Sequence, residues 1–205
     1  MKKLLLVSAT FAEVKHIFHS KHDMNIINYS ANTDILITGI GILPTSYYLT
    51  KHLTNNKYEM VINIGIAGSI GTFKPLETVE VISDTIVSAG KLTKDSFFSM
   101  FNAGYWDENI HPFLSGIIVN EKHFSDLPSA KGITTSIVGF NKNPMKNYKP
   151  DVETMEGAAF SYVCKQFGQK YSSIRTISNY VNSKKWHIEE AIKELNDYII
   201  KKINL

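Results

Sequence analysis

Three polar residues stand where side chains can take part in acid–base chemistry. Glu13 follows the first apolar run of the chain, Glu156 stands at the start of a helical segment, and Asn179 follows a later strand-like run. Carboxylates can transfer protons, and an amide can donate or accept hydrogen bonds beside them. Each acid alone is also typical of a helix N-terminus, where the dipole favours negative charge, and an asparagine alone is typical of a turn. Their shared placement at the ends of strands favours one common cleft.

Two glycine-rich segments also follow strand-like runs. Residues 65–71 read Gly-Ile-Ala-Gly-Ser-Ile-Gly, and Ala67 breaks the dinucleotide-binding pattern Gly-x-Gly-x-x-Gly. The shorter Gly39-Ile40-Gly41 lacks the third glycine of that pattern. We therefore expect no dinucleotide cofactor. Tight turns remain one explanation of these glycines, and their position at strand ends favours the other, a backbone that approaches a small ligand.

Composition and charge exclude several functional classes. The 205 residues include 22 lysines and arginines against 19 aspartates and glutamates, a net charge of +3. This excess is too small and scattered for a nucleic-acid binder. The single arginine, Arg175, lies in an apolar run, where we expect it to pair with a buried acid. The opening run Leu4–Val7 is too short for a signal peptide, and no stretch reaches the ~20 apolar residues that cross a bilayer. We therefore predict a cytoplasmic protein with neither a nucleic-acid nor a membrane partner.

Cysteine and histidine usage argues against a metal centre. The single cysteine, Cys164, excludes an internal disulfide and a cysteine-based zinc site, and its place beside the apolar face of a helix predicts a small core residue. The seven histidines show no spacing typical of metal ligands. We expect no metal and no other cofactor.

The elements that must position these residues alternate between strands and helices. Continuous apolar runs predict buried strands, and apolar residues at helical spacing predict helices. The predicted strands are Lys3–Ser8, Asp34–Thr38, Glu59–Ile64, two short strands within Thr78–Val87 that divide near Ser83, Ile133–Val138 and Tyr171–Ile177. The predicted helices are Phe11–Ser20, Leu43–Lys51, Met155–Phe167 and Trp186–Ile203. This order favours a single α/β domain over residues 1–205, a three-layer α/β/α sandwich around a twisted, mixed sheet.

Two segments interrupt that order. Residues 90–113 carry six aromatic side chains among polar ones, which predicts a long loop or lid. Because exposed aromatic patches usually mark interfaces or ligand grooves, we expect residues 97–113 to form part of a homodimer interface. Residues 141–150 are polar, contain two prolines and predict a loop.

Five short motifs stand in a fixed order along the chain. They are Ala9-x-x-x-Glu13-Val14, Gly39-Ile40-Gly41, Asn63-Ile64-Gly65-Ile66-Ala67-Gly68, Met155-Glu156-Gly157-Ala158-Ala159 and Arg175-Thr176-Ile177-Ser178-Asn179. Through this set the chain resembles the nucleoside phosphorylase/hydrolase superfamily over nearly its whole length. Residues 152–160 and 177–181 are most similar to its futalosine hydrolase branch. The sibling branch of methylthioadenosine/adenosylhomocysteine nucleosidases has aspartate where this chain has Asn179.

The resemblance implies hydrolysis of the N-glycosidic bond of a purine nucleoside. In the futalosine hydrolase branch, futalosine is cleaved to hypoxanthine and dehypoxanthine futalosine in the alternative menaquinone pathway. Glu13 matches the residue that activates water, Glu156 the one that binds the ribose hydroxyls, and Asn179 the one that bonds the departing base. The other positions that the resemblance brings to the substrate are Ala9, Ile40, Ala67, Gly68, Phe140, Met155 and Ser178.

Two departures from the family pattern concern the choice of base. The segment between Ile133 and Met155, which frames the purine in the family, is short here, and its candidates for contact with the base are residues 139–141. The usual Gly-Asp after the glycine-rich turn reads Leu76-Glu77.

Alternatives to futalosine hydrolysis remain open. One is a methylthioadenosine/adenosylhomocysteine nucleosidase, and another is a nucleoside-binding protein without turnover. A nucleoside phosphorylase is disfavoured by the single arginine, because phosphorolysis needs an anion clamp. In related nucleosidases a neighbouring subunit completes the 5′ end of the pocket, which is the role we expect for residues 97–113.

Overall fold

The computed structural model describes residues 2–18, 26–94, 96–138 and 148–203. Its helices are α1 (Ile42–Asn55), α2 (Gly157–Gln166) and α3 (Ile188–Ile203), with a short 3-10 helix η1 (Ala12–Val14). Its strands are β1 (Lys2–Ser8), β2 (Ile26–Asn28), β3 (Thr33–Ile37), β4 (Tyr58–Ser69), β5 (Thr78–Asp84), β6 (Gly90–Leu92), β7 (Phe97–Ser99), β8 (Ile118–Val119), β9 (Ser129–Thr134), β10 (Val152–Thr154) and β11 (Tyr171–Tyr180).

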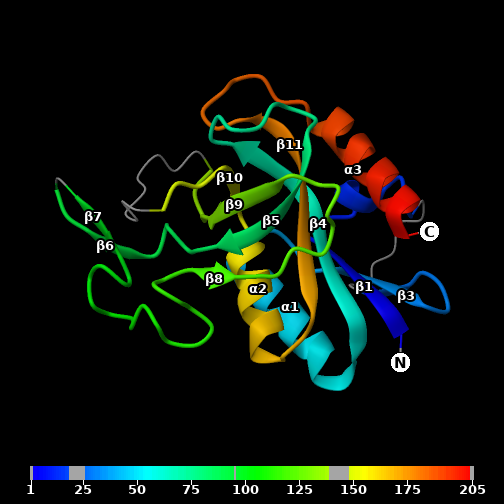
Figure 1. Cartoon of the computed structure of the whole chain (residues 1–205), viewed down its shortest axis with the longest axis horizontal. Helices are drawn as coiled ribbons and strands as arrows, with labels where there is room; N and C mark the ends of the chain where they lie inside the picture. Colours follow the sequence, from blue (N-terminus) through cyan, green and yellow to red (C-terminus); the bar gives the residue numbers. More distant parts are fainter. Residues whose placement is uncertain (1, 19–25, 95, 139–147, 204–205) are drawn as a thin grey trace.

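The fold is the predicted three-layer α/β arrangement around a mixed sheet. Helix α3 covers one face of the sheet, and α1 and α2 cover the other (Figure 1). Strands β3, β1, β4 and β11 lie side by side in that order and run parallel to one another. Their carboxyl ends therefore meet at one edge, where open α/β sheets bind ligands.

The far side of the sheet closes on itself. Strand β11 pairs with β5, β5 with β9, and β9 with β10, while β10 also pairs antiparallel with the end of β4. Strands β4, β11, β5, β9 and β10 thus form a closed ring in the part of the chain that the structure describes. The closure brings β10, which immediately precedes α2, against the carboxyl end of β4.

The core explains why the strands read as continuous apolar runs. On β1, Leu5 and Val7 pack toward α1 and α2, whereas Leu6 packs with Leu195 and Ile199 of α3. Because helices cover both faces of the sheet, successive residues of each strand are buried on alternate faces. Cys164 of α2 is fully buried among these residues, which confirms it as a core position.

A β-bulge interrupts β11 near its carboxyl end. Ile177 pairs with Ala67 and Asn179 pairs with the next residue of β4, Gly68, so Ser178 is one extra residue on β11. Strict alternation would point Ile177 and Asn179 to the same face. The extra residue instead leaves Ile177 in the core with Ala67 and turns Asn179 to the opposite face, with Gly68.

The predicted helix Phe11–Ser20 is wrong over the residues that the structure describes there. A 3-10 turn at Ala12–Val14 and further turns replace it. The N–H groups of His16 and Ile17 donate to the side-chain oxygen of Asn196 on α3 (3.1 and 3.2 Å). A distant side chain thus binds amide groups that an α-helix would bond to its own preceding turn.

Three further predictions need correction. The two strands expected within Thr78–Val87 are one strand, β5, with a register shift against β9 between Val81 and Ser83. Strand β9 ends at Thr134 instead of Val138, because the Thr135 hydroxyl accepts a hydrogen bond from Ile137 N–H (3.1 Å) and turns the chain. Residues 90–113 are not wholly loop, since β6 and β7 form a hairpin.

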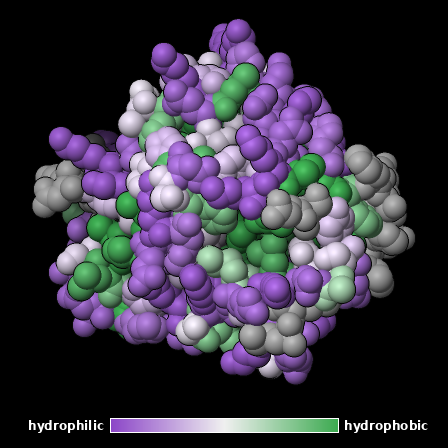
Figure 2. Space-filling model, turned by 45° about the vertical axis from the view of Figure 1, so that its right-hand side comes forward, coloured by the Kyte–Doolittle hydropathy of each residue, from purple (hydrophilic) through white to green (hydrophobic). Residues whose placement is uncertain are grey.

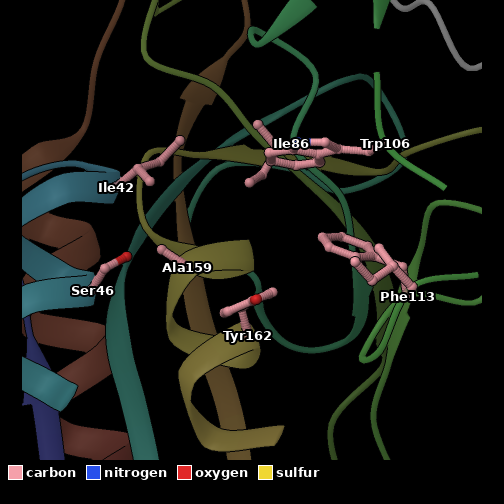
Figure 3. A pocket seen from close by; sticks show the side chains of 8 residues that line it. Ile42, Ser46, Ile86, Trp106, Phe113, Ala159 and Tyr162 are labelled. Carbon is pink, nitrogen blue, oxygen red and sulfur yellow. The ribbon is translucent and has the colours of Figure 1, made fainter. Parts of the chain in front are cut away.

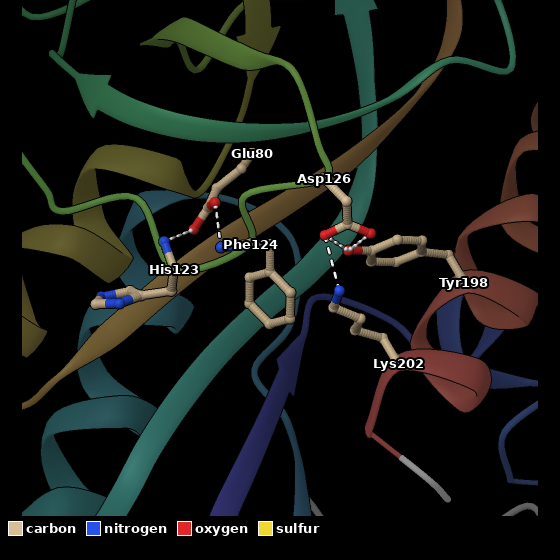
Figure 4. Close-up of polar contacts among 6 residues, drawn as sticks. All are labelled: Glu80, His123, Phe124, Asp126, Tyr198 and Lys202. Atoms are coloured by element: carbon tan, nitrogen blue, oxygen red, sulfur yellow. Dashed lines mark hydrogen bonds and ion pairs between the residues drawn. The ribbon is translucent and has the colours of Figure 1, made fainter.

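A buried acid fixes the long connection between β8 and β9. The carboxylate of Glu80 on β5 accepts hydrogen bonds from the N–H groups of His123 (2.9 Å) and Phe124 (2.7 Å) and from the hydroxyl of Ser172 (2.6 Å). Asp126 at the end of the same connection binds Lys202 of α3 at 2.8 Å (Figure 4). The sheet and α3 are therefore joined by polar contacts beside their apolar core.

Hydrophilic residues cover most of the face drawn in Figure 2, with smaller hydrophobic groups between them. Across the described ranges, no helix combines the length and the apolar character that a membrane span requires.

Candidate active site

A cavity of about 300 Å³ opens at the carboxyl edge of β1, β4 and β11. Nine of the ten residues that the sequence singled out for substrate line it. Phe140 is the tenth, and it lies outside the described residues together with its neighbours Gly139 and Asn141. The nine are Ala9, Glu13, Ile40, Ala67, Gly68, Met155, Glu156, Ser178 and Asn179.

The carboxylate of Glu13 is held by four donors. Its Oε2 accepts hydrogen bonds from the hydroxyl of Ser8 (3.0 Å) and from the N–H (3.1 Å) and hydroxyl (3.3 Å) of Thr10. Its Oε1 accepts from the N–H of Ile66 at 3.3 Å. The short η1 turn after β1 brings the side chain back over the strand ends, where these donors fix its orientation toward the cavity.

Gly65 gives Glu13 room against β4. A Cβ atom at position 65 would lie 2.7 Å from Oε1 of Glu13 and 3.8 Å from Cζ of Arg175. A side chain there would displace the carboxylate, so glycine at this position is a requirement of the site.

Arg175 lies beneath the cavity as a buried cation. Its Nη1 donates to the carbonyl oxygens of Asn63 (3.1 Å) and Ile174 (2.9 Å). Burial lowers the pKa of its guanidinium, while the charges of Glu156, Glu13 and Asp84 act in the opposite direction. The single acid partner predicted from the sequence is thus replaced by three surrounding carboxylates.

Glu156 precedes α2 and faces the loop between β3 and α1. Its Oε1 accepts a hydrogen bond of 2.7 Å from the N–H of Gly41. Gly41 has a φ angle of 98°, a conformation that favours glycine, and this backbone directs its N–H at the acid. Burial raises the pKa of Glu156, and the Gly41 N–H and the charge of Arg175 oppose that rise.

Asp84, the last residue of β5, is a third carboxylate behind the cavity and lies beside the start of α2. Its Oδ1 accepts a hydrogen bond from the hydroxyl of Thr134 (2.9 Å), whose oxygen accepts from the N–H of Ala158 (2.7 Å). Burial raises the pKa of Asp84 to about 7, against the lowering effects of the Thr134 hydroxyl and the Arg175 charge.

Asn179 lies at the other end of the cavity, beyond Gly68. Its Oδ1 accepts from the hydroxyl of Ser178 (2.7 Å) and its Nδ2 donates to the carbonyl oxygen of Tyr180 (2.9 Å). An amide nitrogen carries two hydrogens, so one remains to donate toward a ligand. The cavity therefore has carboxylates at one end and an amide donor at the other.

Sequence reasoning missed several residues of the cavity. Thr10 lines the cavity, and Ser8 lies behind Glu13. Both are at the carboxyl end of β1, and the expectation that ligands bind at the carboxyl ends of strands, which was used for Asn179, applies equally to them. Glu153, three residues before Glu156, also lines the cavity, and the sequence assigned it no role. The side of the cavity against α3 is apolar and is formed by three residues of the predicted helix Trp186–Ile203, to which the sequence assigned no part in the site: Trp186, Ile188 and Ile192.

Within the described ranges, no three histidine, cysteine, aspartate or glutamate side chains come together as they would to hold a metal ion.

A second hollow, of about 320 Å³, lies between α1, α2 and the segment after β7. Ile42 and Ser46 of α1, Ala159 and Tyr162 of α2, and Trp106 and Phe113 point toward it in Figure 3. Phe113 packs edge-to-face against Phe101 and at a tilt against Trp106, at ring-centre distances of 5.0 and 6.2 Å. Ile40 lines the first cavity and Ile42 the second, so the two hollows lie on either side of Gly41.

Comparison with known families agrees with this geometry. The model of the phosphorylase superfamily matches residues 3–202. The chain belongs to the phosphorylase superfamily. The match includes every motif named above, so the resemblance drawn from the sequence is confirmed at the level of the family.

The individual relatives have low sequence identity to this chain. A futalosine hydrolase of Acidothermus cellulolyticus is 25% identical over 215 residues, covering 94% of this chain and 87% of that protein. Among solved structures, a futalosine hydrolase mutant of Helicobacter pylori has a TM-score of 0.70 at 15% identity, with 100% of this chain and 99% of that chain covered. A 5′-methylthioadenosine/S-adenosylhomocysteine nucleosidase mutant of Helicobacter pylori, with 5′-methylthioadenosine in its active site, has a TM-score of 0.73 at 16% identity and the same coverage. Both structures share the fold of this chain.

Proposed function

We propose that this protein is a purine nucleoside N-glycosyl hydrolase and that its substrate is futalosine. The observation that carries the proposal is one cavity with Glu13 and Glu156 at one end and Asn179 at the other. The family match and the futalosine hydrolase of Acidothermus cellulolyticus support the reaction class. Asn179, where a 6-aminopurine nucleosidase of the sibling branch has aspartate, supports hypoxanthine as the base.

In the proposed reaction, Glu13 is the general base. Water bound beside its carboxylate attacks C1′ of the ribose and transfers a proton to Glu13. The C1′–N9 bond breaks, and its electron pair leaves with the base. Four donors to Glu13 hold the carboxylate in one orientation, so a water molecule bound there is already directed at the sugar.

Glu156 and Arg175 serve the sugar end of the site. The breaking bond leaves positive charge on the ribose ring, which a nearby carboxylate stabilises. Glu156 binds the ribose hydroxyls, and its negative charge stabilises the positive ribose ring. Met155 lies against the sugar. The buried guanidinium of Arg175 compensates for the acids gathered in one cavity, and its hydrogen bonds to Asn63 and Ile174 hold it in place.

Asn179 serves the departing base. Its second amide N–H donates to N7 or O6 of hypoxanthine and so stabilises the negative charge that the base carries as it leaves. An asparagine is a weaker proton donor than aspartic acid, so the base takes its proton from solvent. Hypoxanthine accepts the departing electron pair more readily than adenine does, which suits an amide at this position.

The function is tested by product analysis without phosphate. The protein is incubated with futalosine, 5′-methylthioadenosine and inosine, and free base is measured. We expect hypoxanthine from futalosine at a rate that phosphate does not change. A preference for 5′-methylthioadenosine would identify the sibling activity instead, and a strict phosphate requirement with ribose 1-phosphate as product would identify a phosphorylase.

The second hollow, between α1, α2 and Trp106, supports a homodimer as the active form. Trp106 is 38% exposed, Ile110 54% and Tyr162 39%, which is a large apolar surface to leave in water. In the proposed dimer this second hollow binds residues 97–113 of a second copy. The contact closes the 5′ end of the first cavity, beyond Ile40. Sedimentation of wild type and Trp106→Ser tests it: the variant should dissociate and lose activity together. A fully active monomer would contradict the proposal.

A further inference from the structure

Gly68 of β4 separates two buried polar side chains of neighbouring strands. Gly68 pairs with Glu153 of β10 on one side and with Asn179 of β11 on the other. Residues in register on adjacent strands point to the same face of a sheet. Their Cα atoms therefore lie about 10 Å apart, from two strand spacings of ~4.8 Å, with no side chain from Gly68 between them.

Both side chains face the cavity from the protein interior. Glu153 is 7% exposed and Asn179 is 4% exposed, and both line the same hollow. A Cβ atom at Gly68 would lie 3.0 Å from Cγ2 of Val181 and 3.6 Å from Nδ2 of Asn179, so a side chain at this position would crowd the amide.

The reacting carboxylate lies elsewhere along β4. Oε1 of Glu13 accepts from the N–H of Ile66, two residues before Gly68, which is about 7 Å along a strand. The proposed mechanism uses Glu13 and Glu156 at that level and leaves Glu153 without a role. Glu153 therefore stands at the level of the base, away from the bond that breaks.

The two side chains offer opposite hydrogen-bonding groups. A carboxylate accepts, while the remaining N–H of the Asn179 amide donates. The edge of a 6-oxopurine presents a donor at N1–H and acceptors at O6 and N7. The edge of a 6-aminopurine presents an acceptor at N1, which a carboxylate repels, and donors at N6.

We propose that Glu153 is a specificity-determining residue that accepts the N1–H of a 6-oxopurine while Asn179 donates to its O6 or N7. The inference deepens the proposed function and rests on it, since it assigns the base end of the same cavity. It also names the substrate class: nucleosides whose base carries both a 6-oxo group and a hydrogen on N1. A buried acceptor left facing the acceptor N1 of adenine would cost the site a hydrogen bond, which is the arrangement that gives strong discrimination.

The first test uses unaltered protein and modified bases. Binding of hypoxanthine, 1-methylhypoxanthine and adenine is measured by calorimetry. We expect hypoxanthine to bind at least ~10-fold more tightly than either of the others, the effect of one buried hydrogen bond. Equal affinity for hypoxanthine and 1-methylhypoxanthine would overturn the inference, because the methyl group removes the N1 hydrogen.

The second test uses two variants. Glu153→Met removes the acceptor at similar length and should lower kcat/KM for futalosine at least ~10-fold. Glu153→Gln can present either a carbonyl or an amide group and should narrow the ratio of hypoxanthine to adenine binding. Glu121→Gln, at an exposed position, is the control and should change neither.

The outcomes separate the two proposals. Futalosine turnover that persists with an unchanged base preference in both Glu153 variants overturns the role of Glu153 and leaves the proposed function intact. Absence of futalosine turnover in wild type overturns the proposed function, and the free-base affinities of wild type and Glu153→Gln then still decide the role of Glu153.

Discussion

Asn196 of α3 donates a hydrogen bond from Nδ2 to the carbonyl oxygen of Glu13, at a distance of 2.7 Å. The same nitrogen donates to the carbonyl oxygen of Ile192 (2.8 Å), and Oδ1 accepts from the N–H groups of His16 and Ile17. The side chain is fully buried, so one amide satisfies four backbone groups. Asn196 thus fixes the turn from which Glu13 reaches the cavity, although it does not line that cavity itself.

Replacing Asn196 by alanine should impair the reaction more than binding. We expect kcat to fall ~10–100-fold with a much smaller change in KM, because a displaced Glu13 no longer aligns water while the other contacts to substrate remain. Unfolding in urea should also show a loss of ~1–3 kcal/mol from unpaired backbone groups. Asn55→Ala, at an exposed position on α1, is the matched control. An unchanged kcat at reduced stability would limit Asn196 to a structural role.

The variant Glu13→Gln tests the general base directly. Glutamine keeps the size of the side chain but cannot take a proton from water, so kcat should fall ~10²–10⁴-fold. Binding of hypoxanthine, measured by calorimetry, should be retained because Asn179 and Gly68 are untouched. Turnover close to that of wild type would exclude Glu13 as the base.

Asn179→Asp should change the preferred base. An aspartic acid can protonate N7 and accept from N6 of adenine, whereas an ionised carboxylate repels O6 of hypoxanthine. We compare kcat/KM for futalosine and for its adenine counterpart aminodeoxyfutalosine in both proteins. Wild type should prefer futalosine, and the variant should shift toward the amino substrate. A wild-type preference for the adenine substrate would refute the assignment of Asn179.

Asp84 should make the stability of the protein depend on pH. Its pKa in the folded protein is raised by burial to about 7, above the value of ~3.9 expected in the unfolded chain. The folded state therefore binds more protons between these values, and the free energy of unfolding should fall as pH rises from about 4 to 7. Glu156, whose pKa burial also raises, acts in the same direction.

Asp84→Asn isolates the contribution of Asp84 to this slope. Asparagine cannot ionise, and its side-chain oxygen can still accept from the Thr134 hydroxyl. Urea unfolding at pH 5 and pH 8 should show a smaller loss of stability in the variant than in wild type. The same loss in both proteins would mean that Asp84 does not titrate in this range.

Local pattern was sufficient for most of the elements that frame the cavity. The apolar runs of β1, β3 and β11 were predicted with small errors at their ends, because both faces of these strands are buried. Strand β4 was predicted to end at Ile64, but it continues through the glycine-rich segment to Ser69. The helical spacing of α2 and α3 was equally informative. Their order along the chain was enough to bring Glu13, Glu156 and Asn179 to one edge.

Long-range contacts explain what local pattern could not predict. The apolar spacing of Phe11, Val14 and Phe18 is helical, but the Asn196 side chain from far along the chain binds the N–H groups that a helix would use. Glu153 could not be assigned from the sequence, because its place in the cavity depends on pairing between β10 and the end of β4, a contact created only when the sheet closes. Neither β10 nor β4 alone contains a sequence pattern that predicts this pairing.

The extra residue at Ser178 separates a core position of β11 from a cavity position of the same strand. Ile177 packs in the core with Ala67 and Val79, and Asn179 faces the cavity, so the two positions share no neighbours on the same face. Under the proposed function, a mutation at position 179 therefore changes which base the cavity accepts without disturbing the packing that keeps the strand in place. A family built on this strand can diverge in substrate while its fold stays constant, and the bulge is the feature that makes such divergence accessible through single substitutions.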